Sequence, residues 1–128
     1  MSSQPHLFVY GTLQSSFRKK GFARYLAQNA DLVGRARIPG RLYALKRYPG
    51  LRPPQGEEDW VTGEVFRLRV PAPTLRVLDA YEAREYRRVR RWVTLEDSGR
   101  VRCWVYVVWQ PLARERRVTS GTWHNKGS

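Results

Sequence analysis

The strongest constraint on the fold is a stretch near the N-terminus, Leu7-Phe8-Val9-Tyr10-Gly11-Thr12-Leu13. It begins with β-branched and aromatic residues, which are typical of a buried strand, and Gly11 then allows a sharp turn. Backbone N–H groups in such a turn lie beside the Thr12 hydroxyl and act as fixed partial positive charges that can hold a carboxylate or an oxyanion. A buried strand followed by an ordinary tight turn explains the same residues. Both interpretations remain open at this point.

The length of the chain limits it to one domain, because 128 residues can bury a single sizeable core but not two. Hydrophobic residues make up 41% and aromatic residues 12%, which predicts a chain that folds on its own. We expect a single domain over residues 1–123. Residues 124–128 are expected to form a frayed C-terminal tail.

Cysteine and histidine are too sparse for a disulfide or a dedicated metal site. The single cysteine, Cys103, is most simply a small core residue, and His6 and His124 lack the spacing of metal ligands. The sequence therefore predicts neither a metal nor another cofactor. No apolar run is long enough to span a membrane, and residues 1–5 do not begin like a signal peptide. We expect a cytoplasmic protein without a membrane partner, and the oligomeric state cannot be read from the sequence.

The chain is strongly basic, with 24 Lys and Arg against 11 Asp and Glu and a net charge of +13. A charge excess of this size attracts anions, including nucleic acid and acidic substrates. Arginine is concentrated in one segment, at Arg84, Arg87, Arg88, Arg90 and Arg91. A solvated arginine-rich surface explains this, and contact with nucleic acid is the alternative. Against that alternative, no known nucleic-acid motif is present, and the aromatic residues lie mainly in apolar strands rather than between the basic ones.

Six stretches have the composition or alternation of β-strands. They cover residues 7–10, 31–38, 41–45, 60–70, 89–96 and 101–109. Residues 97–100 predict a hairpin between the last two, and residues 48–51 predict a turn, because Pro49 restricts the backbone and Gly50 can bend it. Residues 52–59 predict a surface loop with three acids. The chain is expected to regain order over residues 118–123.

Two helices are also predicted. Phe22, Tyr25 and Leu26 recur at the spacing of one helical face, and Asn29 can end that helix. A second helix begins at residues 71–74, since proline is tolerated in the first turn of a helix.

One face of the second helix carries Leu75, Leu78, Asp79 and Glu82, at positions i, i+3, i+4 and i+7. Glu82 therefore lies on the apolar side, where a carboxylate is costly to desolvate unless something uses it. A structural ion pair with a nearby arginine and a catalytic role both remain open. Glu85 lies off this face and is interpreted as an exposed ion-pair partner.

Six local patterns, taken in order, resemble the γ-glutamylcyclotransferase-like family, also called the AIG2-like family. They are FVYGTL at residues 8–13, GRLYAL with YPGL at 40–51, VTGEVF at 61–66, LDAYEAREYRRV at 78–89, CWVY at 103–106 and VTSGTW at 118–123. The resemblance covers most of the chain. It implies an α+β fold, a compact and mostly antiparallel β-barrel with two or so helices, which agrees with the six strands and two helices interpreted from the residues.

The resemblance also implies a site. Family members hold the substrate with the turn that corresponds here to Tyr10, Gly11, Thr12 and Leu13, and they use the glutamate at Glu82 as general acid/base. Many relatives have a glycine after this glutamate, where this chain has Ala83, which leaves the local backbone open.

Other residues are candidates for lining the pocket. Tyr43, Tyr86 and Tyr106 have hydroxyls that can orient an amine, although buried tyrosines are also common core residues. Glu64 shares a strand face with Phe66 and can also enter the pocket.

The chemistry that the resemblance implies is cyclisation of a γ-glutamyl amine, amino acid or isopeptide to 5-oxoproline with release of the free amine. The substrate supplies its own nucleophile, so the enzyme has to fold the substrate and move a proton from the ammonium to the leaving nitrogen. Glu82 can serve both transfers. The expected partner is thus a small γ-glutamyl molecule; a basic module for nucleic acid or another polyanion, and a non-catalytic small-molecule binder, are the alternatives.

Overall fold

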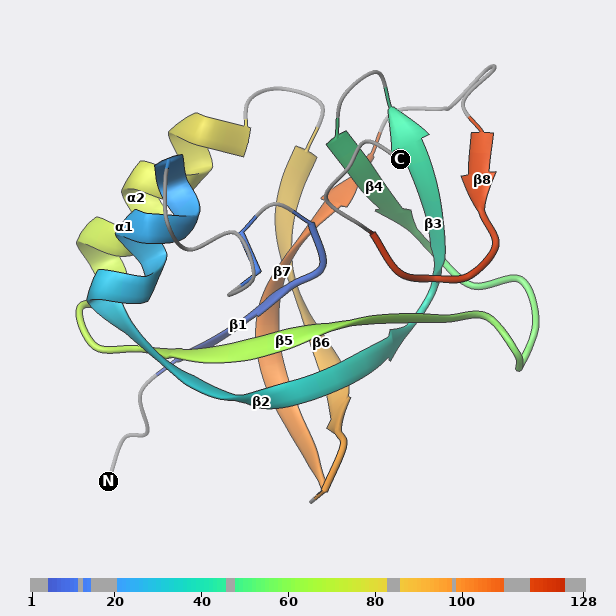
Figure 1. The fold of residues 1–128 in the computed structure, drawn as a ribbon, viewed down its shortest axis with the longest axis horizontal. Coiled ribbons are helices and arrows are strands. Elements are labelled where there is room, and N and C mark those ends of the chain that lie inside the picture. The colour runs from blue at the N-terminus through green and yellow to red at the C-terminus, as the bar shows by residue number, and fades with distance from the viewer. Residues whose placement is uncertain are drawn as a thin grey trace.

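A closed barrel of five strands forms the centre of the computed structural model (Figure 1). In order around the barrel, the strands are β1 (His6–Val9), β5 (Trp60–Leu68), β2 (Ala30–Pro39), β6 (Tyr86–Leu95) and β7 (Arg100–Val108). Neighbouring strands are antiparallel except β1 and β7, whose parallel pairing closes the barrel. The structure describes residues 5–11, 13–14, 21–45, 48–82, 86–97, 99–109 and 116–123, and only the backbone of Tyr48, Glu82 and Arg116.

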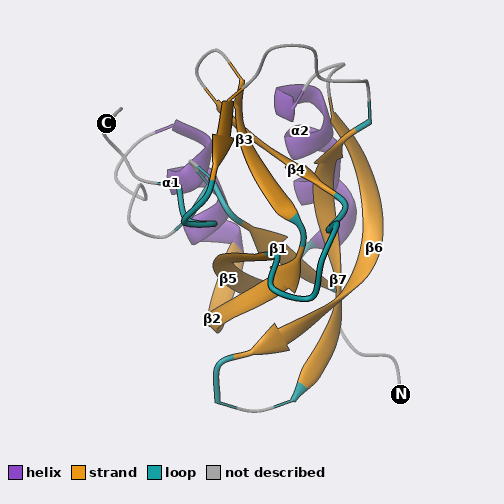
Figure 2. Ribbon diagram, turned by 90° about the vertical axis from the view of Figure 1, so that its right-hand side faces the viewer, coloured by secondary structure: helices purple, strands orange, loops and turns teal. Residues whose placement is uncertain are grey.

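Two helices and a second sheet flank the barrel on different sides (Figures 1 and 2). The helices α1 (Gly21–Asn29) and α2 (Pro71–Glu82) lie side by side, and the rings of Phe22 and Tyr81 meet between them with centroids 4.1 Å apart. The second sheet consists of β4 (Tyr48–Arg52), β3 (Arg41–Leu45) and β8 (Arg116–Val118), in that order.

The hydrophobic core has two parts, separated by the wall of the barrel. One part fills the barrel and includes Phe8, Val61, Val65, Val93 and Val105; the other lies against the helices and includes Leu7, Val9, Leu26, Phe66 and Leu78. Strand β1 supplies both parts because successive side chains point to opposite faces of a strand. This double burial explains why its sequence is continuously apolar.

The expected mostly antiparallel β-barrel with two helices is confirmed. The described residues form eight strands rather than six, and the two additional ones are β4 and β8. The prediction of a turn at residues 48–51 is wrong, since these residues pair with β3 as strand β4. Pro49 is tolerated because β4 is the edge strand of its sheet, and Gly50 is required because a Cβ there would overlap the side chain of Val108.

Other boundaries follow the sequence closely. Helix α1 ends at Asn29, whose side-chain amide donates to the Tyr25 carbonyl at 2.8 Å. Strands β6 and β7 form the expected hairpin, in which the Leu95 N–H donates to the Gly99 carbonyl at 2.9 Å. No helix in the described ranges is long and apolar enough to cross a membrane. The expected tail at residues 124–128 lies outside the described residues.

Candidate functional site

Tyr10 directly follows β1 and fixes the start of the candidate turn. Its ring is buried in the barrel core, and its hydroxyl donates to the Tyr106 carbonyl at 2.6 Å and accepts from the Leu51 N–H at 3.1 Å. One side chain therefore ties the end of β1 to β7 and to β4. Because both bonds are buried, the backbone that enters the turn is held in one place.

Gly11 lies so close to Pro49 that no side chain fits there. A Cβ at this position would lie 2.7 Å from Cγ of the Pro49 ring, which is too rigid to move aside. The Gly11 carbonyl accepts the backbone N–H and the side-chain amide of Gln14, each at 3.1 Å, which closes the turn. The sharp turn predicted at Gly11 is thus confirmed. A glycine is required there because the Pro49 ring lies too close to leave room for a side chain. Thr12 lies outside the described residues.

Leu13, on the far side of the turn, lies in an apolar cluster that also contains residues of helix α2. It is buried in the same cluster as Leu75 and Leu78 of α2, and Tyr81 and Tyr86 pack against that cluster. The turn and the end of α2 therefore share one set of apolar contacts. This brings together two segments that are some seventy residues apart in the sequence.

Tyr86 provides a second link between these segments. It begins β6, four residues after the end of α2, and its hydroxyl donates to the Pro49 carbonyl at 2.6 Å. Pro49 thus contacts Gly11 through its ring and Tyr86 through its carbonyl. Strand β4 therefore links the turn to the start of β6.

Asp79 fixes the last turn of α2 against the barrel. Its carboxylate accepts the Tyr106 hydroxyl at 2.7 Å and both Nε and Nη2 of Arg88, at 2.8 and 3.0 Å. Burial disfavours the ionised form of Asp79, but the hydrogen bonds from Arg88 and Tyr106 outweigh this and lower its pKa. The sequence placed Asp79 on the apolar face of the helix, and the structure gives it a polar anchoring role there.

Glu82 is the final residue of α2, and the description of it is limited to its backbone. Its neighbours Ala83, Arg84 and Glu85 lie outside the described residues, so their expected roles stay predictions. The backbone position of Glu82 follows the anchored Asp79 by three residues.

Two further candidates lie on different elements. Glu64 is only 9% exposed and pairs in register with Val9, the residue before Tyr10, so a buried carboxylate stands beside the turn. Tyr43 lies on β3 in the second sheet, in register with Gly50 and Arg117. Of the three candidate tyrosines, Tyr86 and Tyr106 belong to the cluster around α2, whereas Tyr43 is outside it.

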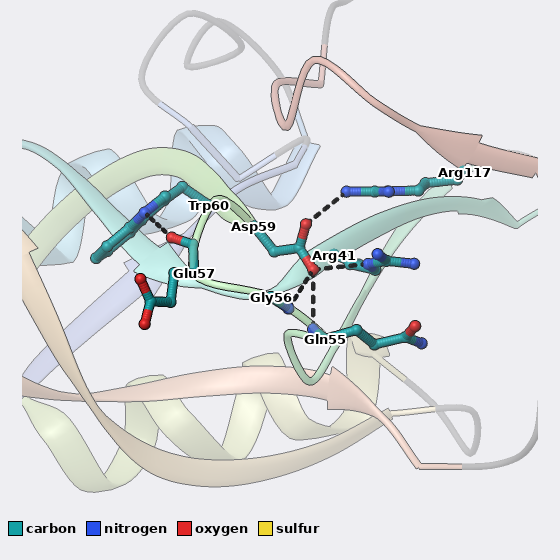
Figure 3. A network of polar contacts seen from close by, with 7 residues as sticks. All are labelled: Arg41, Gln55, Gly56, Glu57, Asp59, Trp60 and Arg117. Carbon is teal, nitrogen blue, oxygen red and sulfur yellow. Dashed lines mark hydrogen bonds and ion pairs between the residues drawn. The ribbon is translucent and has the colours of Figure 1, made fainter.

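A buried acid in the loop before β5 was not anticipated (Figure 3). Asp59 is 9% exposed and accepts Nε of Arg41 at 2.7 Å and Nη2 of Arg117 at 3.0 Å. It also accepts the backbone N–H groups of Gln55 and Gly56. The hydrogen bond from Arg41, followed by that from Gln55, holds the pKa of Asp59 well below its usual range. Nothing in the sequence distinguishes Asp59 from the exposed acids beside it.

Metal ligands do not converge in the part of the chain that the structure describes, where no three His, Cys, Asp or Glu side chains form a group suited to an ion. The segments that do come together are the turn after β1 and the anchored end of α2, with Tyr86 and Tyr106 connecting them to their neighbours.

Comparison with known proteins identifies relatives of this arrangement. The family model for γ-glutamyl cyclotransferase, AIG2-like, matches residues 7–125. Among solved structures, YkqA from Bacillus subtilis is similar with a TM-score of 0.74 and 25% identity over 94% of this chain, which spans only 39% of YkqA. YtfP from Escherichia coli is similar with a TM-score of 0.65 and 32% identity over 96% of this chain and 99% of YtfP.

An AIG2-like protein from Mus musculus is similar with a TM-score of 0.66 and 26% identity, over 86% of this chain and 82% of the mouse protein. The curated proteins contain no match. The family model covers nearly the whole chain, and the fold agrees with it, so the resemblance inferred from the six motifs is confirmed. The chain belongs to the AIG2-like γ-glutamyl cyclotransferase family, and family and fold together support a γ-glutamyl cyclotransferase-like function.

Proposed function

We propose that this chain is an enzyme that cyclises a small γ-glutamyl compound to 5-oxoproline and releases a free amine. The observation that carries the proposal is the convergence of the turn after β1 with the end of α2. Leu13 belongs to the same buried apolar cluster as Leu75 and Leu78 of α2, and Pro49 contacts both Gly11 and Tyr86. A substrate bound at the turn would therefore lie next to the segment that bears Glu82.

The reaction needs positioning and proton transfer more than a protein nucleophile. The α-amino nitrogen of the substrate bonds to its own γ-carbonyl carbon, and the amide bond from that carbon to the leaving nitrogen breaks. The α-nitrogen loses two protons on going from ammonium to lactam N–H, and the leaving nitrogen gains two on going from amide to free ammonium. Glu82 carries protons from the first nitrogen to the second, so that no net proton is consumed. Backbone N–H groups of the turn at residues 10–13 stabilise the charge on the carbonyl oxygen. The chemistry requires no metal.

The tyrosines support this site as positioning residues. The Tyr86 hydroxyl donates to the Pro49 carbonyl and the Tyr106 hydroxyl to Asp79, so both connect the walls of the site. Tyr10 fixes the first residue of the turn in the same way. These bonds keep the turn and the end of α2 at a constant separation, which intramolecular cyclisation needs.

The test is the pair of variants Glu82→Gln and Glu85→Gln, assayed for 5-oxoproline and amine release over a panel of γ-glutamyl amines, amino acids and isopeptides. Glu82→Gln keeps the shape of the side chain but cannot accept the proton, so we expect turnover to fall by about a hundredfold or more. Glu85→Gln removes the same charge three residues later and is expected to keep wild-type turnover. Both variants should unfold at the wild-type temperature.

Full activity of Glu82→Gln would refute the assigned role. Glu64→Gln is the decisive companion variant, because Glu64 is a buried carboxylate in register with Val9, beside the turn. Loss of turnover in Glu64→Gln alone would move the proton transfer to Glu64. Binding of 5-oxoproline without turnover of any compound in the panel would show that the protein is a binder.

A further inference from the structure

The hairpin of β6 and β7 presents an unusual concentration of arginine. The two strands contain six arginines and no acidic residue, at Arg87, Arg88, Arg90, Arg91, Arg100 and Arg102. The turn end of the hairpin extends away from both the helices and the second sheet in two perpendicular views (Figures 1 and 2). Side chains at Arg87, Arg90 and Arg91 of β6 are exposed, as are Arg100 and Arg102 of β7.

Tryptophan rings lie between these arginines in space. The guanidinium groups of Arg88 and Arg90 lie 4.3 and 4.6 Å from the centre of the Trp104 ring. Arg100 lies 4.7 Å from the ring of Trp92. Along the sequence, basic and aromatic residues do not alternate, and this argued against binding of nucleic acid. The pairing of β6 with β7 overturns that objection, since it interleaves the two kinds of side chain across strands.

Most of this positive charge faces solvent and has no acidic partner among the side chains that the structure describes. Within the described ranges, Arg88 is the one arginine of the hairpin that forms an ion pair, with Asp79. Arg87, Arg90 and Arg91 are exposed, as is the ring of Trp92, at 52% of its surface. An exposed aromatic ring among unneutralised guanidinium groups suits a ligand that is both flat and anionic.

A groove of about 440 Å³ lies beside the hairpin, lined by the end of β2, by the end of β4 and the two prolines after it, and by residues of β6 and β7. Arg52, Arg87 and Arg91 line it together with Trp92 and Trp109, and no acidic side chain is among the described residues that line it. Trp109 is 47% exposed, and Arg87 lies 5.0 Å from its ring. This volume is within the range of small-ligand sites.

We propose that the β6–β7 hairpin and this groove bind single-stranded nucleic acid, with bases stacked on Trp92 and Trp109 and phosphates held by the surrounding arginines. Single strands expose both the flat faces of bases and a continuous line of phosphates, which matches this pattern. A duplex hides the base faces. An acidic peptide would meet the charges but leave the exposed tryptophan rings unused. The net charge of +13 adds long-range attraction to the same ligand.

The test is fluorescence anisotropy with labelled oligo-U RNA and oligo-dT DNA of about twelve nucleotides, a length within the range that one small barrel binds. We expect binding that weakens steeply with salt and is accompanied by quenching of tryptophan fluorescence. Trp92→Ala and Trp109→Ala should each weaken binding about tenfold, and Trp92→Phe should recover part of the loss.

A charge-matched pair of double variants separates a local site from the general field of the protein. Arg87→Gln with Arg91→Gln should weaken binding and lower the salt slope by about one to two. Arg24→Gln with Arg76→Gln removes the same charge from exposed positions on α1 and α2 and should change affinity far less. The Glu82→Gln variant should bind like the wild type, because the proposal assigns no nucleic-acid contact to Glu82.

Several results would overturn the proposal. Equal affinity for single strands and duplex, or tryptophan variants that bind like the wild type, would leave only non-specific charge attraction. Binding to vesicles of phosphatidylserine and phosphatidylcholine, without binding to oligonucleotides, would assign the surface to an anionic membrane. Equal losses in the two double variants would show that no local site exists.

Discussion

Tyr10 and Pro49 organise this site through contacts with residues that are distant in the sequence, which local sequence patterns do not predict. Tyr10 belongs to the motif that suggested substrate binding, yet its hydroxyl bonds to the backbone of Tyr106 and Leu51. Pro49 was expected to shape a turn, and instead it contacts both Gly11 and Tyr86. Both residues organise the site from inside the protein. The turn interpretation agrees with the structure, and the anion-site interpretation of residues 7–13 stays a prediction.

Substitution of Gly11 tests the contact with Pro49. In Gly11→Ala the new methyl group would meet Cγ of Pro49 at 2.7 Å, so the turn has to move. We expect the free energy of unfolding to fall by about 1–3 kcal/mol, as in other overpacked sites. The measurement is denaturant unfolding, together with 5-oxoproline release, which should fall as well.

Gly34→Ala is the matched control, because a Cβ at Gly34 meets no atom within 4 Å. Its stability should stay within about 0.5 kcal/mol of wild type, as for most surface substitutions. Equal effects of the two substitutions would mean that the approach to Pro49 does not matter.

Elements are held in place here by a few polar anchors as well as by apolar packing. Asp79 fixes the end of α2 to β6 and β7, and Asp59 fixes the loop at residues 53–59 to Arg41 on β3 and Arg117 on β8. Both carboxylates accept hydrogen bonds from several donors, which stabilise the ionised form of each acid in the folded protein. The stabilising effect of these anchors should therefore depend on pH.

The contribution of Asp59 is expected to depend on pH in a defined direction. The hydrogen bond from Arg41 and then that from Gln55 lower the pKa of Asp59 in the folded protein. Its stabilising effect is therefore present above the unfolded-state pKa of about 3.9 and is lost as the pH falls toward the folded-state pKa. The difference in unfolding free energy between wild type and Asp59→Asn should be large at neutral pH and shrink below about pH 4.

Glu57→Gln and Glu58→Gln provide the comparison, since both acids are exposed in the same loop. Neither substitution should change stability appreciably across this pH range. A difference between wild type and Asp59→Asn that stays constant down to pH 3 would contradict the pairing, because it would not depend on the charge of Asp59.

At the scale of the whole molecule, the parallel pair of β1 and β7 closes the barrel, and Cys103 lies in it opposite His6. The thiol is 1% exposed, and burial raises its pKa to about 12. Because the thiolate is the reactive form, native Cys103 should react with a thiol reagent only when the barrel opens. The expectation of a small core cysteine is thus confirmed.

Thiol labelling at mildly alkaline pH should therefore report the opening of the barrel. We expect the labelling rate of the native protein to be far below that of the unfolded chain and to rise with denaturant together with global unfolding. Immediate labelling of the native protein, at the rate measured in strong denaturant, would show that β1 and β7 do not hold the barrel closed.

The local patterns of the sequence were sufficient for most elements and for the family. Helical spacing predicted α1 closely, and strand composition and turn residues predicted β3 and the β6–β7 hairpin, because each depends on contacts between neighbours in the chain. Strand β4 was missed, since a proline and a glycine usually interrupt strands. Only an edge position and the packing of Gly50 against Val108 make them suitable there.

The candidate residues of the turn and Glu82 were also available from the sequence, through the six motifs. What only the tertiary structure decided is how the turn, β4 and α2 meet, that Asp59 is buried among arginines, and that arginines of β6 lie over a tryptophan of β7. Each of these depends on pairing between distant segments. The physical reason is that burial and charge compensation are properties of the assembled core, and no local pattern of residues specifies which distant side chains will share it.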